Sequence, residues 1–117
     1  MPKNSLDTQL AANDRQLAQR RAMNDQLEVP REVDHFAYFR KRADAETVAE
    51  LLRDQGLVVA LSGSGRKTEL AAHGRSAVDP ATVSAFVTAI FRTVEAHGGV
   101  YDGWGGPIVG AASDDAS

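Results

Sequence analysis

Residues 79–99 carry the pattern that most restricts how this chain can fold. Asp79 precedes Pro80, so a capping side chain is followed by a proline at the first helical position. Large apolar side chains then recur at intervals of three and four, and Gly98-Gly99 end the repeat. The repeating residues are Val83, Phe86, Val87, Ile90, Phe91 and Val94. The pattern predicts a helix with one apolar face, which needs a sheet or another helix to pack against.

A second amphipathic helix is predicted between Asp44 and Gly56. Asp44 fits the N-cap position and Gly56 fits the residue after the C-cap. The predicted buried face contains Val48, Leu51 and Leu52. Each of the two helices therefore has one face to bury.

A third helix is predicted over residues 5–27. It ends before Val29-Pro30, because the residue preceding a proline is pushed out of the helical region. Its apolar stripe is thin, so this helix is not stable alone. It either docks on the rest of the chain or frays.

Four short segments have the composition of β-strands: residues 33–39, 57–61, 68–73 and 100–105. The middle two are joined by the short Ser62-Gly63-Ser64-Gly65 connection, which favours a hairpin. The order βαββαβ predicts an α+β, ferredoxin-like sandwich, a four-stranded antiparallel sheet with two helices on one face, plus the extra N-terminal helix.

The chain is expected to have three parts: an N-terminal helical extension over residues 1–28, a folded domain over residues 29–110 and a disordered tail over residues 111–117. No apolar stretch is long enough to cross a bilayer, and the N-terminus lacks the apolar region of a signal peptide. Cysteine is absent, which excludes disulfides. These features favour a cytoplasmic protein.

Catalytic chemistry finds little support in the sequence. His35, His73 and His97 lack the partner spacing of a helical metal site, so neither a metal nor a cofactor is expected. The segment 62–65 lies in a predicted hairpin, whereas a nucleophile elbow joins a strand to a helix. We therefore expect no catalytic residues. An enzyme or small-ligand domain remains an alternative, and a buried polar pocket joining Asp34, His35 or Asp102 would favour it.

The segment 33–39 places large apolar groups on both faces of its strand. Alternation sets Phe36 and Tyr38 on one face, and the other face has Val33, His35, Ala37 and Phe39. One face must pack against the two central helices. The other is covered by the N-terminal helix, a second subunit or a partner, or else it is exposed.

The closing segment Tyr101-Asp102-Gly103-Trp104-Gly105 contains the only tryptophan of the chain. Glycine in a strand allows another backbone or a large ring to approach closely. Two interpretations stay open: Trp104 packs over Gly103 or Gly105 in the interior, or it helps to line a recognition surface.

Residues 31–39, Arg-Glu-Val-Asp-His-Phe-Ala-Tyr-Phe, and the closing residues 101–105, Tyr-Asp-Gly-Trp-Gly, resemble the RraB family of bacterial regulators of ribonuclease E. The similarity spans roughly residues 24–109. It implies a ferredoxin-like domain without catalytic activity that binds the arginine-rich scaffold region of ribonuclease E and inhibits cleavage of transcripts. The better-known members are strongly acidic with long acidic tails, whereas this chain has a net charge of −3 and a short tail, so its electrostatic attraction is smaller.

The leading hypothesis is thus a non-enzymatic protein-interaction module that binds ribonuclease E or another basic protein and modulates RNA turnover. The predicted partner-binding residues are Phe36, Tyr38, Tyr101, Asp102 and Trp104 for local contact, and Glu46, Glu50, Asp54 and Glu95 for long-range attraction. The alternatives are a single-stranded RNA-binding domain with exposed aromatic side chains on its sheet, and the enzyme or small-ligand domain. Pairing of two copies into a homodimer through the sheet is compatible with each of them.

Overall fold

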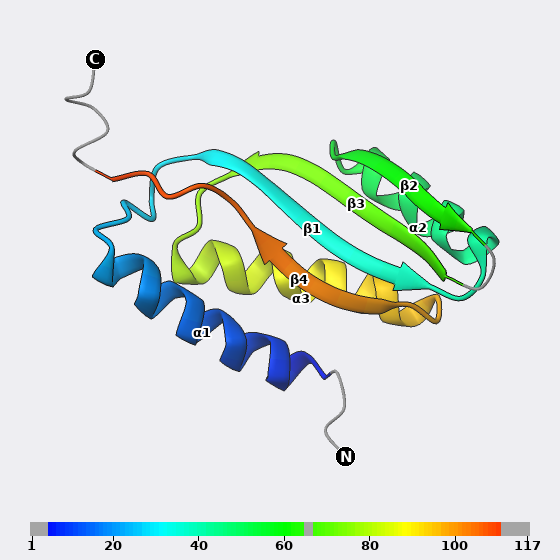
Figure 1. Ribbon diagram of the computed structural model, residues 1–117, viewed down its shortest axis with the longest axis horizontal. Helices are drawn as coiled ribbons and strands as arrows, with labels where there is room; N and C mark the ends of the chain where they lie inside the picture. The colour runs from blue at the N-terminus through cyan, green and yellow to red at the C-terminus, as the bar shows by residue number, and fades with distance from the viewer. Residues whose placement is uncertain (1–4, 65–66, 111–117) are drawn as a thin grey trace.

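The computed structural model describes residues 5–64 and 67–110, whose arrangement is shown in Figure 1. Its elements in chain order are α1 (Leu6–Ala22), β1 (Arg31–Phe39), α2 (Arg42–Asp54), β2 (Val58–Ser64), β3 (Lys67–Ser76), α3 (Pro80–Ala96) and β4 (Val100–Gly105). The tail predicted to be disordered, residues 111–117, lies outside the described residues. Each predicted helix and strand has a counterpart.

The four strands of the described residues form one sheet in the order β2-β3-β1-β4. All neighbouring strands are antiparallel, and β1 lies between β3 and β4. The consecutive strands β2 and β3 form the predicted hairpin. These findings confirm an α+β protein with an antiparallel four-stranded sheet.

One face of this sheet is covered by helices. Along β1, Val33, Ala37 and Phe39 are buried, whereas Phe36 is 41% exposed. Helix α2 packs on β1, β2 and β3, and α3 packs on β4 (Figure 1). Successive side chains of a strand point to opposite faces. The alternating burial along β1 confirms the prediction that Phe36 and Tyr38 lie on one face, and Val33, His35, Ala37 and Phe39 on the other.

Helix α1 docks on the domain through α3, along which it lies in Figure 1. Leu17 is buried in this contact, and Asn13 Oδ1 accepts a hydrogen bond from Trp104 Nε1 at 2.9 Å. The helix ends at Ala22, earlier than predicted, because Asn24 adopts a φ of 61°, in the left-handed region. The alternative in which this helix frays is therefore wrong for the described residues.

The predicted start of α3 is confirmed, whereas that of α2 is wrong. Asp79 Oδ2 accepts a hydrogen bond from the backbone N–H of Thr82 at 3.2 Å. Helix α2 begins at Arg42, and Lys41 occupies the N-cap position without a side-chain hydrogen bond. Asp44 lies in the first turn instead, where a carboxylate still interacts favourably with the helix dipole.

The buried face of α2 also differs from the prediction at Leu51, which is 40% exposed. The buried residues are Ala45, Val48, Ala49 and Leu52, spaced i, i+3, i+4 and i+7. Two alanines complete this face, and Leu51 lies beyond its edge. Alanines let the α2 backbone approach the sheet closely.

The β2–β3 hairpin is longer than predicted. Strand β2 continues through Gly63 to Ser64, so these residues belong to the ladder rather than to a loop. Gly63 has a φ of +94°, and a Cβ there would lie 2.5 Å from the carbonyl oxygen of Lys67. Glycine is required at this position for both reasons.

Candidate functional site

The sheet has a second face, which no helix of the described residues covers. We call it the open face, and all four strands contribute side chains to it. It consists of Glu32, Asp34, Phe36 and Tyr38 of β1, Lys67, Glu69, Ala71, His73 and Arg75 of β3, Val58, Ala60 and Ser62 of β2, and Val100 and Asp102 of β4. A surface of this kind suits contact with another macromolecule.

The charge of the open face is negative. Its carboxylates are Glu32, Asp34, Glu69 and Asp102, against the permanent cations Lys67 and Arg75. The remaining titratable base, His73, contacts two of the carboxylates directly. The open face therefore favours a cationic partner when His73 is neutral.

His73 lies at the centre of a cluster of charged side chains. Its Nδ1 is 2.7 Å from Asp34 Oδ1, and its Nε2 contacts Glu32. Glu32 also accepts a hydrogen bond from Arg75 at 3.4 Å. Hydrogen bonds to Asp34 and then to Glu32 raise the pKa of His73 above its ordinary value. The charge at this point of the open face therefore depends on pH.

Two aromatic rings flank this cluster on β1. Phe36 is exposed over about two fifths of its surface, 41%, and the Lys67 ammonium lies 4.3 Å from the centroid of the Tyr38 ring. The negative charge of Asp102, followed by that of Glu69, raises the pKa of the Tyr38 hydroxyl. An aromatic ring that holds one cation beside two carboxylates is a suitable docking point for a guanidinium group.

Tyr101 and Trp104 do not lie on this surface, which corrects their expected position beside Phe36 and Tyr38. They are 1% and 8% exposed and point into the helix layer. A β-bulge is the cause: Phe36 pairs with Gly103 and Ala37 pairs with Tyr101, so Asp102 is the extra residue. The bulge brings residues 101 and 104 to the same face, although simple alternation would separate them.

The surroundings of Trp104 decide between its two interpretations. Its ring packs edge-on against Phe86 at 5.5 Å between centroids, and the Arg20 guanidinium lies 5.0 Å from the ring. Together with the hydrogen bond to Asn13, these contacts join α1 and α3 to β4. Trp104 is thus an interior residue, packed against α1 and α3.

The acidic residues predicted for long-range attraction lie on the helices, on the other side of the molecule from the open face. Glu46 is 3.3 Å from Arg42, and Glu50 is 3.9 Å from Arg53. The charges of Glu46 and Glu50 are thus compensated by neighbouring arginines on α2. Asp54 of α2 and Glu95 of α3 are exposed. The structure therefore does not bring the acidic residues of the helices together with Asp102.

A buried ionic cluster forms where α1, β1 and the segment after β4 meet, and sequence reasoning missed it. Asp25 accepts from Arg20 at 3.1 Å and from Arg31 at 2.6 Å, and its side chain is inaccessible to solvent. Burial would raise the pKa of Asp25, but hydrogen bonds from Arg31, Val109 N–H and Arg20 outweigh this effect and lower it. Arg20, Asp25 and Arg31 lie five and six residues apart in the chain, and in the sequence they look like ordinary polar surface residues, so no local signal indicates that they are buried together.

The polar pocket that would favour an enzyme is not assembled from the predicted residues. His35 is buried under the helices, whereas Asp34 and Asp102 lie on the open face. Within residues 5–64 and 67–110, no group of three or more His, Asp or Glu side chains is arranged to hold a metal ion. None of the helices in these ranges is long and apolar enough to span a membrane.

Comparison with known proteins finds a family model described as regulator of ribonuclease activity B (RraB), which matches residues 10–106. The match begins within α1 and runs through all four strands. It confirms the resemblance drawn from residues 31–39 and 101–105. A comparison with curated proteins finds no match.

Proposed function

The chain belongs to the regulator of ribonuclease activity B (RraB) family, and on that premise we propose that it is a non-enzymatic module that binds and inhibits ribonuclease E. In this role it modulates RNA turnover in the cytoplasm through protein contact, without catalysis of its own. The order βαββαβ and the strand order β2-β3-β1-β4 support the ferredoxin-like class that the family resemblance implies.

The observation that carries the proposal is the chemistry of the open face. Phe36 and Tyr38 are apolar anchors, and carboxylates surround them on three strands. A disordered arginine-rich segment offers the complementary groups, because guanidinium ions both pair with carboxylates and stack on aromatic rings. We therefore place the contact with ribonuclease E on the open face.

The acidic side chains of α2 and α3 have a secondary role in this proposal. Arg42 and Arg53 compensate Glu46 and Glu50 locally, so their field at a distance is weak. Asp54 and Glu95 add to long-range attraction without direct contact. Specific contact then depends on the aromatic and acidic groups of the open face.

The RNA-binding alternative also uses the aromatic rings of the open face, of which Phe36 is exposed and Tyr38 half-buried, but it requires the opposite surface charge. Single-stranded RNA needs cations along its backbone. The carboxylates of the open face outnumber Lys67 and Arg75, and they repel phosphate. A basic protein segment fits this surface better.

Charge reversal on two surfaces tests the location of the contact. The variant Glu69→Lys/Asp102→Lys changes the open face beside Tyr38, and the matched variant Glu46→Lys/Glu50→Lys makes the same charge change on α2. We expect the first to weaken binding of purified ribonuclease E at least about tenfold in calorimetric titrations at low salt, and the second to weaken it much less.

Two results would contradict the proposal. If the unmodified chain fails to bind ribonuclease E at low salt, the proposed partner is wrong. If both variants lose affinity equally, the contact is not on the open face. A parallel titration with single-stranded oligoribonucleotides separates the RNA-binding alternative, for which the open-face variant should bind more tightly.

A further inference from the structure

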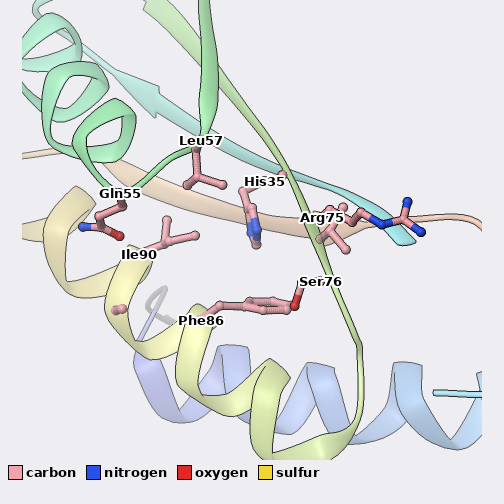
Figure 2. A pocket seen from close by; sticks show the side chains of 10 residues that line it. His35, Gln55, Leu57, Arg75, Ser76, Phe86 and Ile90 are labelled. Carbon is pink, nitrogen blue, oxygen red and sulfur yellow. The ribbon is translucent and has the colours of Figure 1, made fainter. Parts of the chain in front are cut away.

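A cavity of about 170 Å³ lies on the covered side of the sheet, between α3 and the end of α2. Leu57, Phe86 and Ile90 are apolar residues in its wall, and His35 of β1 projects into it (Figure 2). Gly74 of β3 also lines it, and a Cβ at this residue would lie 2.5 Å from Leu57 Cδ2, so a larger residue would displace Leu57 from the wall. The cavity is thus built by residues of α3, of β1 and β3, and of the segment between α2 and β2.

His35 supplies a hydrogen-bonding group inside this cavity. The side chain is 4% exposed, and its Nδ1 lies 3.3 Å from the hydroxyl of Tyr101. Its Nε2 has no hydrogen-bond partner among the described residues. Among these residues, Asn13 Nδ2 is the one side-chain nitrogen or oxygen that is both inaccessible to solvent and without a partner, so His35 Nε2 is not completely sealed from solvent. In Figure 2 the imidazole is directed into the space between Ile90 and Phe86. An uncommitted ring nitrogen is thus available to a molecule in the cavity.

Two of the other polar side chains in the lining are turned away or already bonded, and the third is the amide of Gln55. The guanidinium of Arg75 points away from the cavity in Figure 2 and donates to Glu32. Ser76 Oγ donates to the carbonyl of Ala77 at 2.8 Å. Burial lowers the pKa of His35 to about 4, so the imidazole is neutral at pH 7. The cavity therefore combines apolar walls with the neutral imidazole of His35, and the amide of Gln55 lies in the same lining.

We propose that this cavity binds a small planar aromatic molecule with one hydrogen-bonding group, of the size class of phenol. An engineered apolar cavity of roughly 150 Å³ binds benzene, so the volume here accommodates a single ring. The Phe86 ring meets the imidazole edge-on at 4.8 Å between centroids, and a ligand ring adds to this aromatic arrangement. His35 selects a polar substituent over a purely apolar ring. This site is independent of the proposed contact with ribonuclease E.

Titration of the full chain with phenol and with toluene, followed by NMR, tests the proposal. Phenol should give saturable shifts centred on His35, Phe86 and Ile90, and toluene should bind at least about tenfold more weakly because it leaves His35 Nε2 unpartnered. In His35→Leu the preference for phenol should disappear. Equal affinity of the two probes for the unmodified chain would overturn the assigned role of His35.

A second variant keeps the test decisive if His35→Leu does not fold. Ala89 lines the cavity and is exposed on α3, so Ala89→Phe blocks the opening without changing the core. Ala96→Phe places the same ring on an exposed position of α3 outside the lining. Phenol binding should be lost in the first variant and unchanged in the second. Binding that survives Ala89→Phe, or shifts that do not saturate in the unmodified chain, would overturn the site.

Discussion

At the scale of single residues, His73 makes the open face sensitive to pH. Its pKa is raised because Asp34 and Glu32 hydrogen-bond to the protonated ring. A group whose pKa is higher in the folded than in the unfolded chain stabilises the fold most below its unfolded pKa, and this stabilisation is lost as the pH rises through the folded pKa. The relevant window therefore begins near the ordinary value of 6.5 and extends upward.

Thermal unfolding of the chain and of His73→Gln checks this prediction. The unmodified chain should have the higher Tm at about pH 5.5, and the difference should shrink at about pH 9 because the imidazole is then neutral. His97→Gln is a control, since His97 contacts the carbonyl oxygen of Thr93 near the end of α3 and no carboxylate among the residues that the structure describes. A Tm difference for His73→Gln that is constant over this range would contradict the expectation.

Asp25 illustrates a different kind of residue, one whose importance is structural. Asp25→Asn removes the negative charge between Arg20 and Arg31, leaving buried guanidinium groups without a counter-ion. Breaking a buried ion pair on one side costs about 3–5 kcal/mol, so urea denaturation should show a loss of this order. Glu46→Gln breaks an exposed pair with Arg42 and should cost less than about 1 kcal/mol. Equal losses would show that the cluster is not tightly packed.

At the scale of elements, the glycines of the strands are not equivalent. Gly63→Ala introduces a Cβ at a φ of +94° and against the Lys67 carbonyl, so the β2–β3 hairpin should lose about 1–2 kcal/mol. Gly105→Ala is the control, because a Cβ there meets nothing within 4 Å. Urea denaturation of the two variants measures the contrast. A Gly63→Ala variant as stable as Gly105→Ala would show that the hairpin relaxes easily.

The elements also show what the sequence could predict and why. Local signals sufficed for α3, where Asp79, Pro80 and the apolar spacing agree, and for the faces of β1. The position of Trp104 depends on the bulge at Asp102, which shifts the register of β4 by one residue. A period of two along the strand contains no signal for that shift. Gly103, with a φ of +115°, is the residue whose type could have indicated it.

The candidate site was predicted in part for the same reason. Phe36 and Tyr38 follow from alternation alone, and both lie on the open face. His73, Glu32 and Asp34 come together only through the pairing of β1 with β3, over a long sequence separation. The register of that pairing cannot be deduced from either strand by itself.

At the scale of the whole molecule, the charged and aromatic side chains of the open face lie on one side of the sheet, and the helices with the cavity near His35 lie on the other. The open face presents charge and aromatic rings to the solvent, and the helix side contains a cavity whose wall includes His35 and apolar side chains. The ionic cluster at Asp25 ties α1 and the segment after β4 to the start of β1. The helix layer is thereby held against the sheet, which keeps Trp104 and the neighbouring rings inside, while the opposite face stays uncovered by helices of the described residues.

This separation predicts how the proposed binding of ribonuclease E should respond to salt. Attraction between exposed charges is screened within about 10 Å at 0.1 M salt, whereas contact with the Tyr38 ring is short-range. The loss of affinity caused by Glu69→Lys/Asp102→Lys should therefore shrink as salt is raised from about 0.05 to about 0.5 M, and the loss caused by Tyr38→Ala should persist. Calorimetric titrations of both variants across this range measure the two effects. If both losses of affinity shrink together as salt rises, Tyr38 acts through the surrounding charges and does not anchor the partner. If neither loss shrinks, the carboxylates contact the partner in a desolvated interface, where salt has little access.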